Sequence, residues 1–554
     1  MYSSKDHVNI LTALLLGHGV RHAVVCPGSR NSLVVHNLAV CPELTCYPVT
    51  DERSAGFYAL GICQVLGEPV VVCVTSGSAL LNVAPAVAEA CYQHLPLVVV
   101  SADRPAQWID QLDGQTLPQP GALGGLVRKA VNLAEPHDDE ERWYCNRLVN
   151  EALLAVRRGG GGPVHINVPI GEPLFDYTVE RLPRERVIHG LPTEPTVVNR
   201  DMLARFEHAR RPMIVVGQLR RGAFPQSLGG RLHALGYVVL QERLSIAGRT
   251  AAGLDETMAL IDGDDRYLPD FILYVGDTLV SKQARRFLRR ARGAECWTVC
   301  PDGEIHDVLM NLTGVIAAEP RDVLQQLGTA SMTTFRDLWA AVQLRAARYR
   351  AVFEPDYSQM LAVKRLEELT ERDAPGSETH YANSTAVRLG CIFSWHYIHC
   401  NRGVNGIEGS LSTAAGYSLA TDRHVYCVIG DLSFFYDQNA LWNRNLRGNL
   451  RILLLNNGCG GIFYQLDGLD RSPACDRYVA ASHRTTAEGI CRENGIAYYC
   501  ADNTASLNRL LEVLTVARSD RPILLEVQTD GREDARIYQN YIQNIKIWKE
   551  TGNP

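Results

Sequence analysis

Residues 405–463 read NGIEGSLSTAAGYSLATDRHVYCVIGDLSFFYDQNALWNRNLRGNLRILLLNNGCGGIF, and this stretch decides the fold. A run with helical spacing, Leu411 to Ala420, is followed by two apolar strands at 425–429 and 451–455. The segment between the strands is long enough for a helix, which predicts a βαβ unit with both strands parallel in one sheet. Such a unit places the carboxyl ends of its strands at one edge, where open α/β folds bind ligands.

Polar residues follow both strands at that edge. Asp431 follows the first strand in Gly-Asp-Leu-Ser, and Asn457 follows the second in Asn-Asn-Gly. We expect the two side chains to face one another, and their oxygens suit Mg²⁺, which takes few protein ligands and completes its shell with phosphate oxygens and water. The alternative is two ordinary core strands with polar turns. The Gly-x-x-Gly-Ser that precedes the helix argues against that alternative.

Length and composition are those of an ordinary globular protein. The 554 residues suggest three or four domains, and the formal net charge of −6 without a basic block gives no reason to expect nucleic acid. The 16 cysteines stand singly, without Cys-x-x-Cys, which is typical of reduced thiols in a cytosolic protein. We expect no signal peptide and no membrane span, because no apolar run approaches about 20 residues.

The first third repeats a pattern of strand, polar turn and helix. Apolar strands at 23–25, 70–74 and 97–100 each end in a polar turn, and a helix is expected at 80–92. The repetition predicts a doubly wound parallel sheet.

Two turns of this third carry candidate site residues. Ser29 and Arg30 lie between a strand and a helix, where free N–H groups and a guanidinium can bind a carboxylate or phosphate; a capping serine beside a solvated arginine is the alternative. Glu52 lies in the first turn of a helix whose small residues, such as Gly56 and Gly61, permit close packing. By itself Glu52 would be interpreted as a capping residue.

A second α/β set occupies the middle of the chain. Strands are expected at 213–216, 237–240 and 271–275, after a linker from 169 to about 196 that is rich in proline and charge. No Gly-x-Gly-x-x-Gly is present, so neither FAD nor NAD is assigned. Residues 330–375 are expected to be helical and connecting. We therefore predict an α/β fold of three doubly wound parallel-sheet domains, at residues 1–180, 195–345 and 375–554.

The last domain adds further candidates. Ser384 lies at a helix start, and Arg388 follows one helical turn later on the same face. The spacing His396-x-x-His399 is compatible with a metal site, but no third ligand is nearby, so we interpret the histidines as a surface or interface pair. The polar tail after Asp530 is expected to pack late or lie loose.

Together these motifs resemble the thiamine diphosphate (ThDP) enzymes, whose diphosphate-binding motif is Gly-Asp-x-Ser followed after roughly 25 residues by Asn-Asn. Within that family the chain is similar to the menaquinone-pathway branch called MenD, the 2-succinyl-5-enolpyruvyl-6-hydroxy-3-cyclohexene-1-carboxylate (SEPHCHC) synthases. The likeness spans both terminal thirds, and the middle third matches mainly in outline. It depends on residues 27–32, 50–53, 101–105, 114–116, 383–388, 401–403 and 430–433.

The resemblance implies a fold, a reaction and an assembly. The implied domains are an N-terminal pyrimidine-binding and a C-terminal diphosphate-binding ThDP fold, with a Rossmann-like domain between them. The implied reaction uses ThDP and Mg²⁺ (or Mn²⁺) to decarboxylate 2-oxoglutarate and add the resulting succinyl carbanion equivalent to isochorismate by 1,4-conjugate addition, giving SEPHCHC and CO₂. The implied assembly is a cytoplasmic homodimer or homotetramer, with active sites where the N-terminal domain of one subunit meets the C-terminal domain of another.

The resemblance also implies roles for individual residues. Glu52 is the carboxyl group that hydrogen-bonds the pyrimidine ring, in a desolvated pocket that favours a raised pKa, and Ile407 is the bulky residue that holds the cofactor bent. The other implied cofactor contacts are Ser384, Gly409, Ser410, Asp431, Leu432, Ser433, Asn457, Ile462 and Phe463. The implied metal ligands are Asp431, Asn457 and the backbone carbonyl of Cys459. The implied contacts to the anionic substrates are Ser29, Arg30, Arg104, Gln115, Lys282, Ser384, Arg388 and Arg402.

Two positions depart from the family pattern. Gln283 stands where the family has an arginine after Lys282, and Arg285 or Arg286 could substitute for it. Gly114 stands where the family often has asparagine. The nearest rival is an acetolactate synthase-like ThDP carboligase, whose middle domain would need FAD contacts. A non-catalytic protein that keeps the fold is a second rival, and the retention of Glu52 and Asp431 argues against it.

Overall fold

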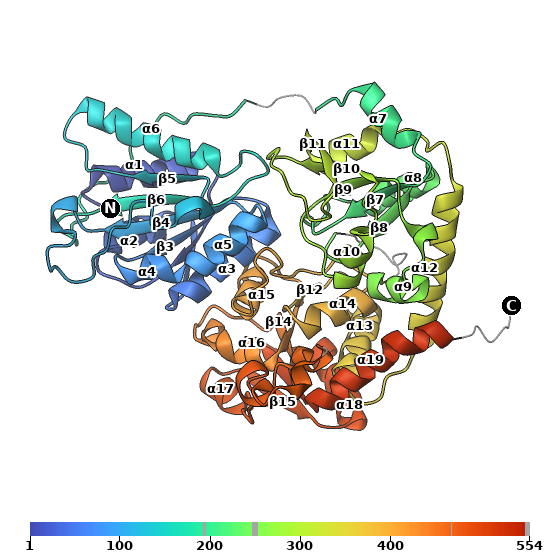
Figure 1. The fold of residues 1–554 in the computed structure, drawn as a ribbon. Coiled ribbons are helices and arrows are strands. Elements are labelled where there is room, and N and C mark those ends of the chain that lie inside the picture. Colours follow the sequence, from blue (N-terminus) through green and yellow to red (C-terminus); the bar gives the residue numbers. More distant parts are fainter. Residues whose placement is uncertain (192–195, 246–252, 467, 549–554) are drawn as a thin grey trace.

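The computed structural model describes residues 1–191, 196–245, 253–466 and 468–548, and these residues form three wholly parallel sheets (Figure 1). The first sheet lies between residues 22 and 169, the central sheet between 212 and 317, and the last between 378 and 528. The predicted α/β class with three parallel sheets is confirmed. The exact domain boundaries remain a prediction.

In residues 1–191 the first sheet has six strands, in the order β2-β1-β3-β4-β6-β5. Its strands are β1 His22–Val25, β2 Thr45–Pro48, β3 Val70–Val74, β4 Leu97–Asp103, β5 Lys129–Asn132 and β6 Val164–Pro169. The helices around it are α1 Asp6–Gly17, α2 Ser32–Val40, α3 Glu52–Leu66, α4 Ser78–Asn82, α5 Ala84–Tyr92 and α6 Asp139–Ala155. The central strands β3 and β4 are buried along their whole length, as expected for valine-rich strands with both faces covered.

The single helix predicted over 80–92 is wrong, because the structure has two. The first ends at Asn82 and the second begins at Ala84, with Pro85 in its first turn. Proline has no N–H to donate to the preceding turn and its ring crowds that turn, so a continuous helix is disfavoured here.

The central sheet has five strands among the described residues, in the order β11-β10-β9-β7-β8. Its strands are β7 Pro212–Val216, β8 Val238–Gln241, β9 Phe271–Val275, β10 Glu295–Cys300 and β11 Leu312–Ala317. Its helices are α7 Arg200–Glu207, α8 Gln226–Ala234, α9 Leu254–Ile261, α10 Lys282–Leu288 and α11 Pro320–Gln326. The helical connection predicted for 330–375 is confirmed by α12 Thr334–Val352 and α13 Gln359–Asp373.

The last sheet has five strands in the described part, in the order β12-β13-β14-β16-β15. Its strands are β12 Glu378–Tyr381, β13 Val425–Gly430, β14 Leu450–Asn456, β15 Ala497–Ala501 and β16 Ile523–Gln528. Its helices are α14 Thr385–Phe393, α15 Ser410–Leu419, α16 Asp431–Tyr436, α17 Glu488–Glu493, α18 Thr504–Val516 and α19 Gly531–Ile547. Strands β13 and β14 pair in parallel with Gly430 opposite Leu455, so the residues that follow them share one sheet edge.

The first and last domains meet where α3 crosses α15 (Figure 1). A Cβ at Gly61 would lie 2.1 Å from the carbonyl oxygen of Thr413, and one at Gly416 would lie 2.2 Å from that of Tyr58. Glycine is therefore required on both helices at this crossing. The close packing predicted for Gly61 is confirmed, and it joins two domains.

The segment that follows Asp530 forms α19, so the expectation that it lies loose is wrong. Helix α19 is capped by the Asp530 carboxylate, which accepts from the N–H groups of Arg532 and Glu533. Tyr541 and Ile545 are fully buried, and the Tyr541 hydroxyl donates to Glu256 of α9 at 2.8 Å. An apolar stripe at helical spacing holds this polar segment against the central domain.

Two further features of the described residues are the state of the thiols and the length and polarity of the helices. Every cysteine is a free thiol, and Cys500 is the exposed one. Across the described residues, no helix is both long enough and apolar enough to cross a membrane.

Candidate active site

Asp431 lies at the carboxyl end of β13 and begins α16. Its side chain is 3 % exposed. Its Oδ1 accepts from the Leu432 N–H at 2.7 Å, and its Oδ2 accepts from the Cys459 N–H at 3.1 Å. The second bond places the turn after β14 directly beside the carboxylate. The expectation that the two strand ends share one sheet edge is confirmed, and the facing of the Asp431 and Asn457 side chains remains a prediction.

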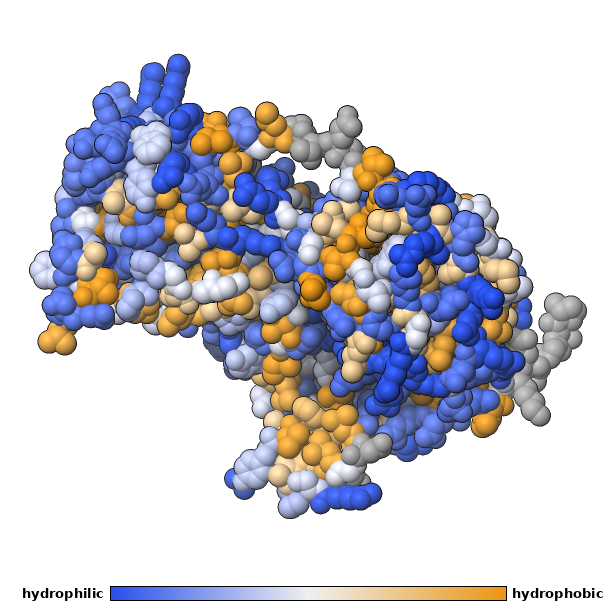
Figure 2. All heavy atoms as spheres, turned by 45° about the horizontal axis from the view of Figure 1, so that its top comes forward, coloured by the Kyte–Doolittle hydropathy of each residue, from blue (hydrophilic) through white to orange (hydrophobic). Residues whose placement is uncertain are grey.

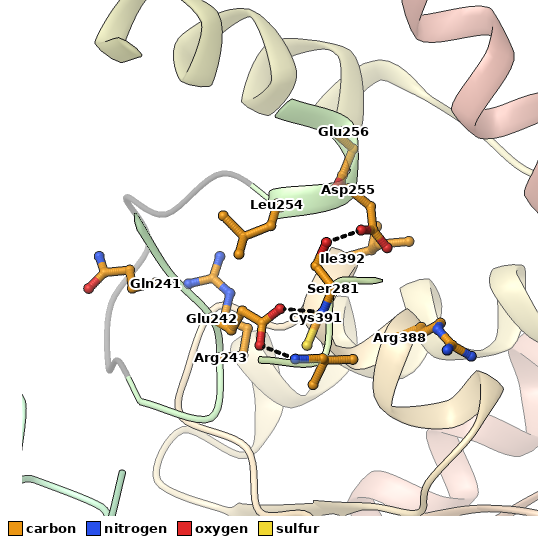
Figure 3. Close-up of a pocket in the computed structure, with 12 residues that line it drawn as sticks. Gln241, Glu242, Arg243, Leu254, Asp255, Glu256, Ser281, Arg388, Cys391 and Ile392 are labelled. Carbon is orange, nitrogen blue, oxygen red and sulfur yellow. Dashed lines mark hydrogen bonds between the residues drawn. The ribbon is translucent and has the colours of Figure 1, made fainter. Parts of the chain in front are cut away.

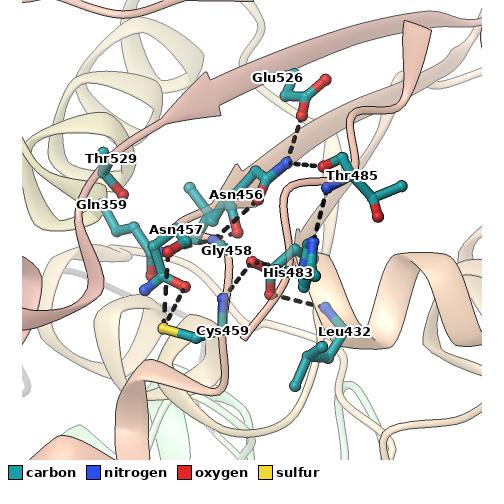
Figure 4. A network of polar contacts seen from close by, with 12 residues as sticks. Gln359, Leu432, Asn456, Asn457, Gly458, Cys459, His483, Thr485, Glu526 and Thr529 are labelled. Carbon is teal, nitrogen blue, oxygen red and sulfur yellow. Dashed lines mark hydrogen bonds and ion pairs between the residues drawn. The ribbon is translucent and has the colours of Figure 1, made fainter. Parts of the chain in front are cut away.

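His483 approaches the same carboxylate from the other side. Its Nε2 lies 3.4 Å from Asp431 Oδ2, and its Nδ1 accepts from the Thr485 N–H at 3.1 Å (Figure 4). The proton of a neutral ring is therefore assigned to Nε2, which faces Asp431. The adjacent Asp431 carboxylate raises the pKa of His483.

Asn457 is oriented by a carboxylate from α19. Its Nδ2 donates to Asp534 Oδ2 at 3.2 Å, and Asp534 also accepts from the Thr529 hydroxyl at 2.7 Å and the Gln359 N–H at 2.9 Å. Burial raises the pKa of Asp534 to about 6. Because the Nδ2 end of the amide is engaged, Oδ1 is the end left on the side of Cys459, 3.6 Å from its Sγ (Figure 4).

These groups fit a hard cation bound to a diphosphate. The edge presents a carboxylate and an amide oxygen from adjacent turns, with the backbone of Cys459 between them. An all-oxygen set with few protein ligands is what Mg²⁺ takes when phosphate oxygens complete its shell.

The turn before α15 supplies a second part of the site. Gly409 has φ +75°, and a Cβ there would lie 2.3 Å from the ring of Phe57 on α3. Ser410 begins the helix with a buried Oγ that has no hydrogen-bond partner among the described residues. Ile407 is 43 % exposed, and its carbonyl accepts from the Ser433 hydroxyl. A helix N-terminus with an unpartnered hydroxyl suits a phosphate oxygen.

Leu432, Ile462 and Phe463 lie near these turns. Leu432 follows Asp431 directly and is half-buried. Ile462 and Phe463 lie in a short 3-10 turn, Gly461–Gln465, that follows Cys459, and both are half-buried. A cavity there is lined by Thr385, Asn457 and Gly461 among others, so the start of α14 lies beside the turn after β14.

A group of cations gathers around the start of α14. Ser384 precedes the helix with φ +74°, and Arg388 follows one turn later with an Nη1 that is buried and unpartnered within the described chain. The Arg402 Nη1 donates to Asn383 Oδ1 at 3.2 Å, so Arg402 lies next to Ser384. Polar groups left without partners in a buried region are candidates for ligand contact.

Lys282 of the central domain follows a residue that lines a cavity together with Arg388. Arg388 and Ser281 line one cavity between the central and last domains (Figure 3). Lys282 is the exposed first residue of α10. Gln283 and Arg286 are exposed beside it, whereas Arg285 is half-buried with an unpartnered Nε among the described residues. The substitute for the family arginine remains a prediction.

The candidates of the first domain lie at the carboxyl edge of its own sheet. Arg30 is buried and donates to the Ile170 carbonyl at 2.8 Å, and burial and the charge of Arg104 lower its pKa. Arg104 is paired with Asp113 at 2.9 Å and donates to the Gly114 carbonyl at 3.0 Å. Two further candidates, Ser29 and Gln115, are exposed there.

Glu52 begins α3 and accepts from Asn82 Nδ2 at 3.1 Å. Its neighbours contact the last domain of the same chain, since Asp51 Oδ2 accepts from Asn439 at 2.7 Å and Arg53 donates to the Tyr436 carbonyl at 2.7 Å. In the described residues, no hydrogen bond or ion pair joins Glu52 to the side chains at the edge of the last sheet.

Sequence reasoning missed Asp534 and His483, and it left open whether one histidine pair lies at the surface or at an interface. Neither missed residue belongs to a motif, and each acts through a contact between segments far apart in the chain. His399 is 3 % exposed and His396 lies 3.1 Å from Glu367, so the surface alternative for this pair is wrong. The pair lies at the seam with the central domain, where the Ile398 N–H donates to the Arg243 carbonyl at 2.9 Å.

Comparison with known proteins agrees with this geometry. The model of the thiamine pyrophosphate enzyme N-terminal TPP binding domain matches residues 6–122, and that of the C-terminal TPP binding domain matches residues 387–527. Proteins named 2-succinyl-5-enolpyruvyl-6-hydroxy-3-cyclohexene-1-carboxylate synthase are similar over the full length. Those of Bacteroides thetaiotaomicron and Bacteroides fragilis are 43 % and 42 % identical, each covering 99 % of this chain and 100 % of the relative. That of Porphyromonas gingivalis is 34 % identical over 98 % of both chains.

Proposed function

The chain belongs to the SEPHCHC synthases, a branch of the thiamine pyrophosphate enzymes, and on that premise we propose that it transfers a succinyl group from 2-oxoglutarate, with loss of CO₂, to isochorismate. The product of this 1,4-addition is SEPHCHC, an intermediate of menaquinone biosynthesis. We assign the reaction to the cytoplasm, in agreement with the free thiols.

One observation supports the choice of substrates: two arginines lie in and beside the start of α14, and a lysine follows a residue that lines the same cavity as one of them. Arg388 and Arg402 flank Ser384, and Lys282 follows the residue that shares a cavity with Arg388. Both proposed substrates carry two carboxylates, and guanidinium groups bind carboxylates in a bidentate manner. Arg30 and Arg104 of the first domain, with Ser29 and Gln115, would serve the remaining carboxylates.

The residues at the edge of the last sheet would hold ThDP and Mg²⁺ (or Mn²⁺). Asp431, Asn457 and the Cys459 carbonyl would bind the cation, while Gly409, Ser410 and the N-terminal N–H groups of α15 would bind the diphosphate. When bound, ThDP supplies an electron sink for the pair of electrons released by decarboxylation. Ile407, Ile462 and Phe463 would exclude water from that centre, and Glu52 would hold a proton at the pyrimidine ring.

We further propose that Glu52 reaches the cofactor of a partner subunit, which makes a homodimer the smallest active unit. Within this chain Glu52 bonds to Asn82 rather than to the residues of the last sheet. Large apolar side chains are exposed on the segments next to the site, and Figure 2 shows an apolar area over the last third of the chain. These side chains are Leu81, Ile407, Tyr436, Trp442 and Leu466. Exposed apolar groups of this extent are typical of a protein interface.

A product assay tests the proposed reaction. Purified protein with ThDP and Mg²⁺ should form SEPHCHC and CO₂ from 2-oxoglutarate and isochorismate, and it should form no acetolactate from pyruvate alone. Product from pyruvate, with none from the other pair, would replace this proposal by the acetolactate synthase-like alternative.

A further inference from the structure

Glu242 is a buried carboxylate that holds the main chain leading into Lys282. It follows β8 and is 6 % exposed. Its Oε2 accepts from the Val280 N–H at 2.6 Å and its Oε1 from the Ser281 N–H at 2.7 Å (Figure 3). Each oxygen of one carboxylate is therefore engaged by one of the two amides that precede Lys282.

A second set of contacts fixes the same turn. Ser281 caps α10, because its Oγ accepts from the Ala284 N–H at 3.0 Å. The same hydroxyl donates to Asp255 of α9 (Figure 3). The start of α10 is thus held from both sides, by Glu242 at the main chain and by Asp255 at the capping side chain. Lys282 begins the helix at this doubly held point.

Glu242 also lines a cavity that includes Arg388, another proposed substrate contact. The cavity is lined by Glu242 and Ser281 from the central domain and by Arg388 from the last domain. The charge of Arg402 acts on Glu242, lowering its pKa against the larger effect of burial. A buried carboxylate is costly unless its oxygens are well bonded, and here the bonds go to the main chain beside a proposed substrate contact.

We propose that Glu242 is a positioning residue for the transfer reaction, fixing the backbone at Val280 and Ser281 so that the ammonium of Lys282 is held for a substrate carboxylate. The inference depends on the proposed function, because it presupposes that Lys282 contacts a substrate. Glu242 itself touches neither substrate nor cofactor.

The test compares four variants of the full chain. Glu242→Gln keeps the size of the side chain but turns an N–H donor toward one of two N–H donors, which leaves a buried amide without an acceptor. Glu242→Asp keeps the charge and shortens the reach. Lys282→Ala removes the proposed contact. Glu207→Gln is the matched control, because Glu207 is also buried and accepts from a main-chain amide, that of Gly328 at 2.7 Å, without contacting the start of α10.

The first readout is amide hydrogen exchange, which does not depend on the reaction. We expect faster exchange at Val280 and Ser281 in Glu242→Gln, with partial recovery in Glu242→Asp and no change there in Glu207→Gln. Thermal unfolding identifies any variant that has lost its fold. If Glu242→Gln is unfolded, amide exchange is compared between Glu242→Asp and the wild type instead. Unchanged exchange at both amides in a folded Glu242→Gln would overturn the proposal.

The second readout is the split between KM and kcat. We expect Glu242→Gln to raise KM for one dianionic substrate about tenfold, with kcat changed far less, and Lys282→Ala to raise the same KM. Glu207→Gln should leave both constants unchanged. A rise with Lys282→Ala but none with Glu242→Gln overturns the positioning role alone. A wild-type chain that forms no product overturns the proposed function instead, while the exchange result still stands.

The third readout is the pH profile. Burial raises the pKa of Glu242 to about 7, so its proton is lost within the working range. A protonated carboxyl accepts poorly at one oxygen, and KM of the wild type should therefore rise as the pH falls below about 7, whereas KM of Glu242→Gln should not follow that titration. The other charged or titratable groups facing Glu242 are Asp255, Tyr274, Cys391 and Arg402, with Arg243 next in sequence. Parallel profiles for the two proteins would contradict the proposal.

Discussion

At Asn457, one hydrogen bond decides which end of the amide is left for a cation. The bond from Nδ2 to Asp534 leaves the oxygen on the side of Cys459, with only a weak thiol contact, and a carboxylate that fixes a metal ligand in this way commonly matters for affinity almost as much as the ligand. Asp534 is buried and is held by two further donors, so its own orientation is fixed. The proposed cation site thus depends on a residue that would not itself bind the cation.

Asp534→Asn should weaken Mg²⁺ binding in the presence of ThDP by about tenfold or more, because the new amide can present an N–H to Asn457 and favour the flipped side chain. A calorimetric titration with Mg²⁺ measures this effect. The control is Asp530→Asn, which alters the cap of the same helix without a bond to Asn457. Equal Mg²⁺ affinities for Asp534→Asn and the wild type would show that Asp534 does not orient a ligand.

Glu52→Gln should bind ThDP and yet lose decarboxylation by orders of magnitude, because the amide cannot share a proton with the ring nitrogen. ThDP binding is followed by calorimetry and CO₂ release by a coupled assay. Asn82→Ala, which removes the hydrogen bond to Glu52 within this chain, serves as the control and should retain most of the activity. Near-normal turnover by Glu52→Gln would refute the role assigned to this carboxylate.

The sequence predicted the site residues that follow strands, and it did not predict those that act from a distance. Asp431 and Asn457 could be placed because parallel strands end at one edge. Asp534 lies 77 residues from Asn457, and Glu242 lies 38 residues from Val280, in segments without a motif. Contacts of this kind depend on how elements pack, which local sequence patterns do not encode.

At the scale of elements, the crossing of α3 and α15 joins the two ThDP-type domains within one chain. Both helices approach so closely that main-chain atoms of one lie where a Cβ of the other would be. The Tyr58 hydroxyl extends the contact by donating to the Ala440 carbonyl at 2.6 Å. The contact fixes the start of α3, which carries Glu52, against the last domain.

Gly416→Ala should lower the free energy of unfolding by about 1–3 kcal/mol or more, because its methyl group would overlap the backbone of Tyr58. Thermal and urea unfolding measure the change. Gly489→Ala on α17 is the matched control, since nothing lies within 4 Å of a Cβ there, and it should be neutral or slightly stabilising. A Gly416→Ala protein as stable as this control would mean that the crossing is looser than described.

Position in the sheet did not decide which strands could be predicted, since the interior strands β10 and β16 were missed and the edge strand β8 was predicted. Strands β3, β13 and β14 are buried runs of apolar residues, and their patterns were plain. Strands β2 and β5 lie at the edges of the first sheet, where exposed positions interrupt the pattern, and they were not predicted. Helix α19 was mistaken for a loose tail because many charged residues stand between the few apolar residues that pack inward.

At the scale of the whole molecule, all three domains hold the segment that carries Arg402. Glu89 of the first domain accepts from the N–H groups of Gly403 and Val404 at 2.7 and 2.8 Å. Gln218 of the central domain donates to the Cys400 carbonyl at 3.1 Å. The segment itself belongs to the last domain. The position of a proposed substrate contact therefore depends on how the three domains fit together.

The free energy of unfolding should depend on pH through the titration of Glu242, and the raised pKa of this group fixes the sign of that dependence. Burial raises its pKa from 4.5 to about 7, so between these values the folded chain keeps a proton that the unfolded chain has released. This group therefore lowers the free energy of unfolding as the pH rises, by up to about 1.4 kcal/mol per pH unit, and adds nothing further above about 7. The Tm of the wild type should fall relative to that of Glu242→Gln between about pH 5 and about pH 7. A Tm difference that stays constant or widens in favour of the wild type would contradict this linkage.

The central claim is that each active site combines Glu52 of one subunit with Asp431 and Asn457 of another. Co-expression of Glu52→Gln and Asp431→Asn chains with different affinity tags measures it most directly, because each variant alone should be inactive. In a mixed dimer across a shared interface, one site would receive both substitutions and the other would receive none. The account predicts that purified mixed dimers regain about half of the wild-type activity, and random mixtures about a quarter. Mixed dimers as inactive as the parent variants would contradict it, since every site would then be built within a single chain.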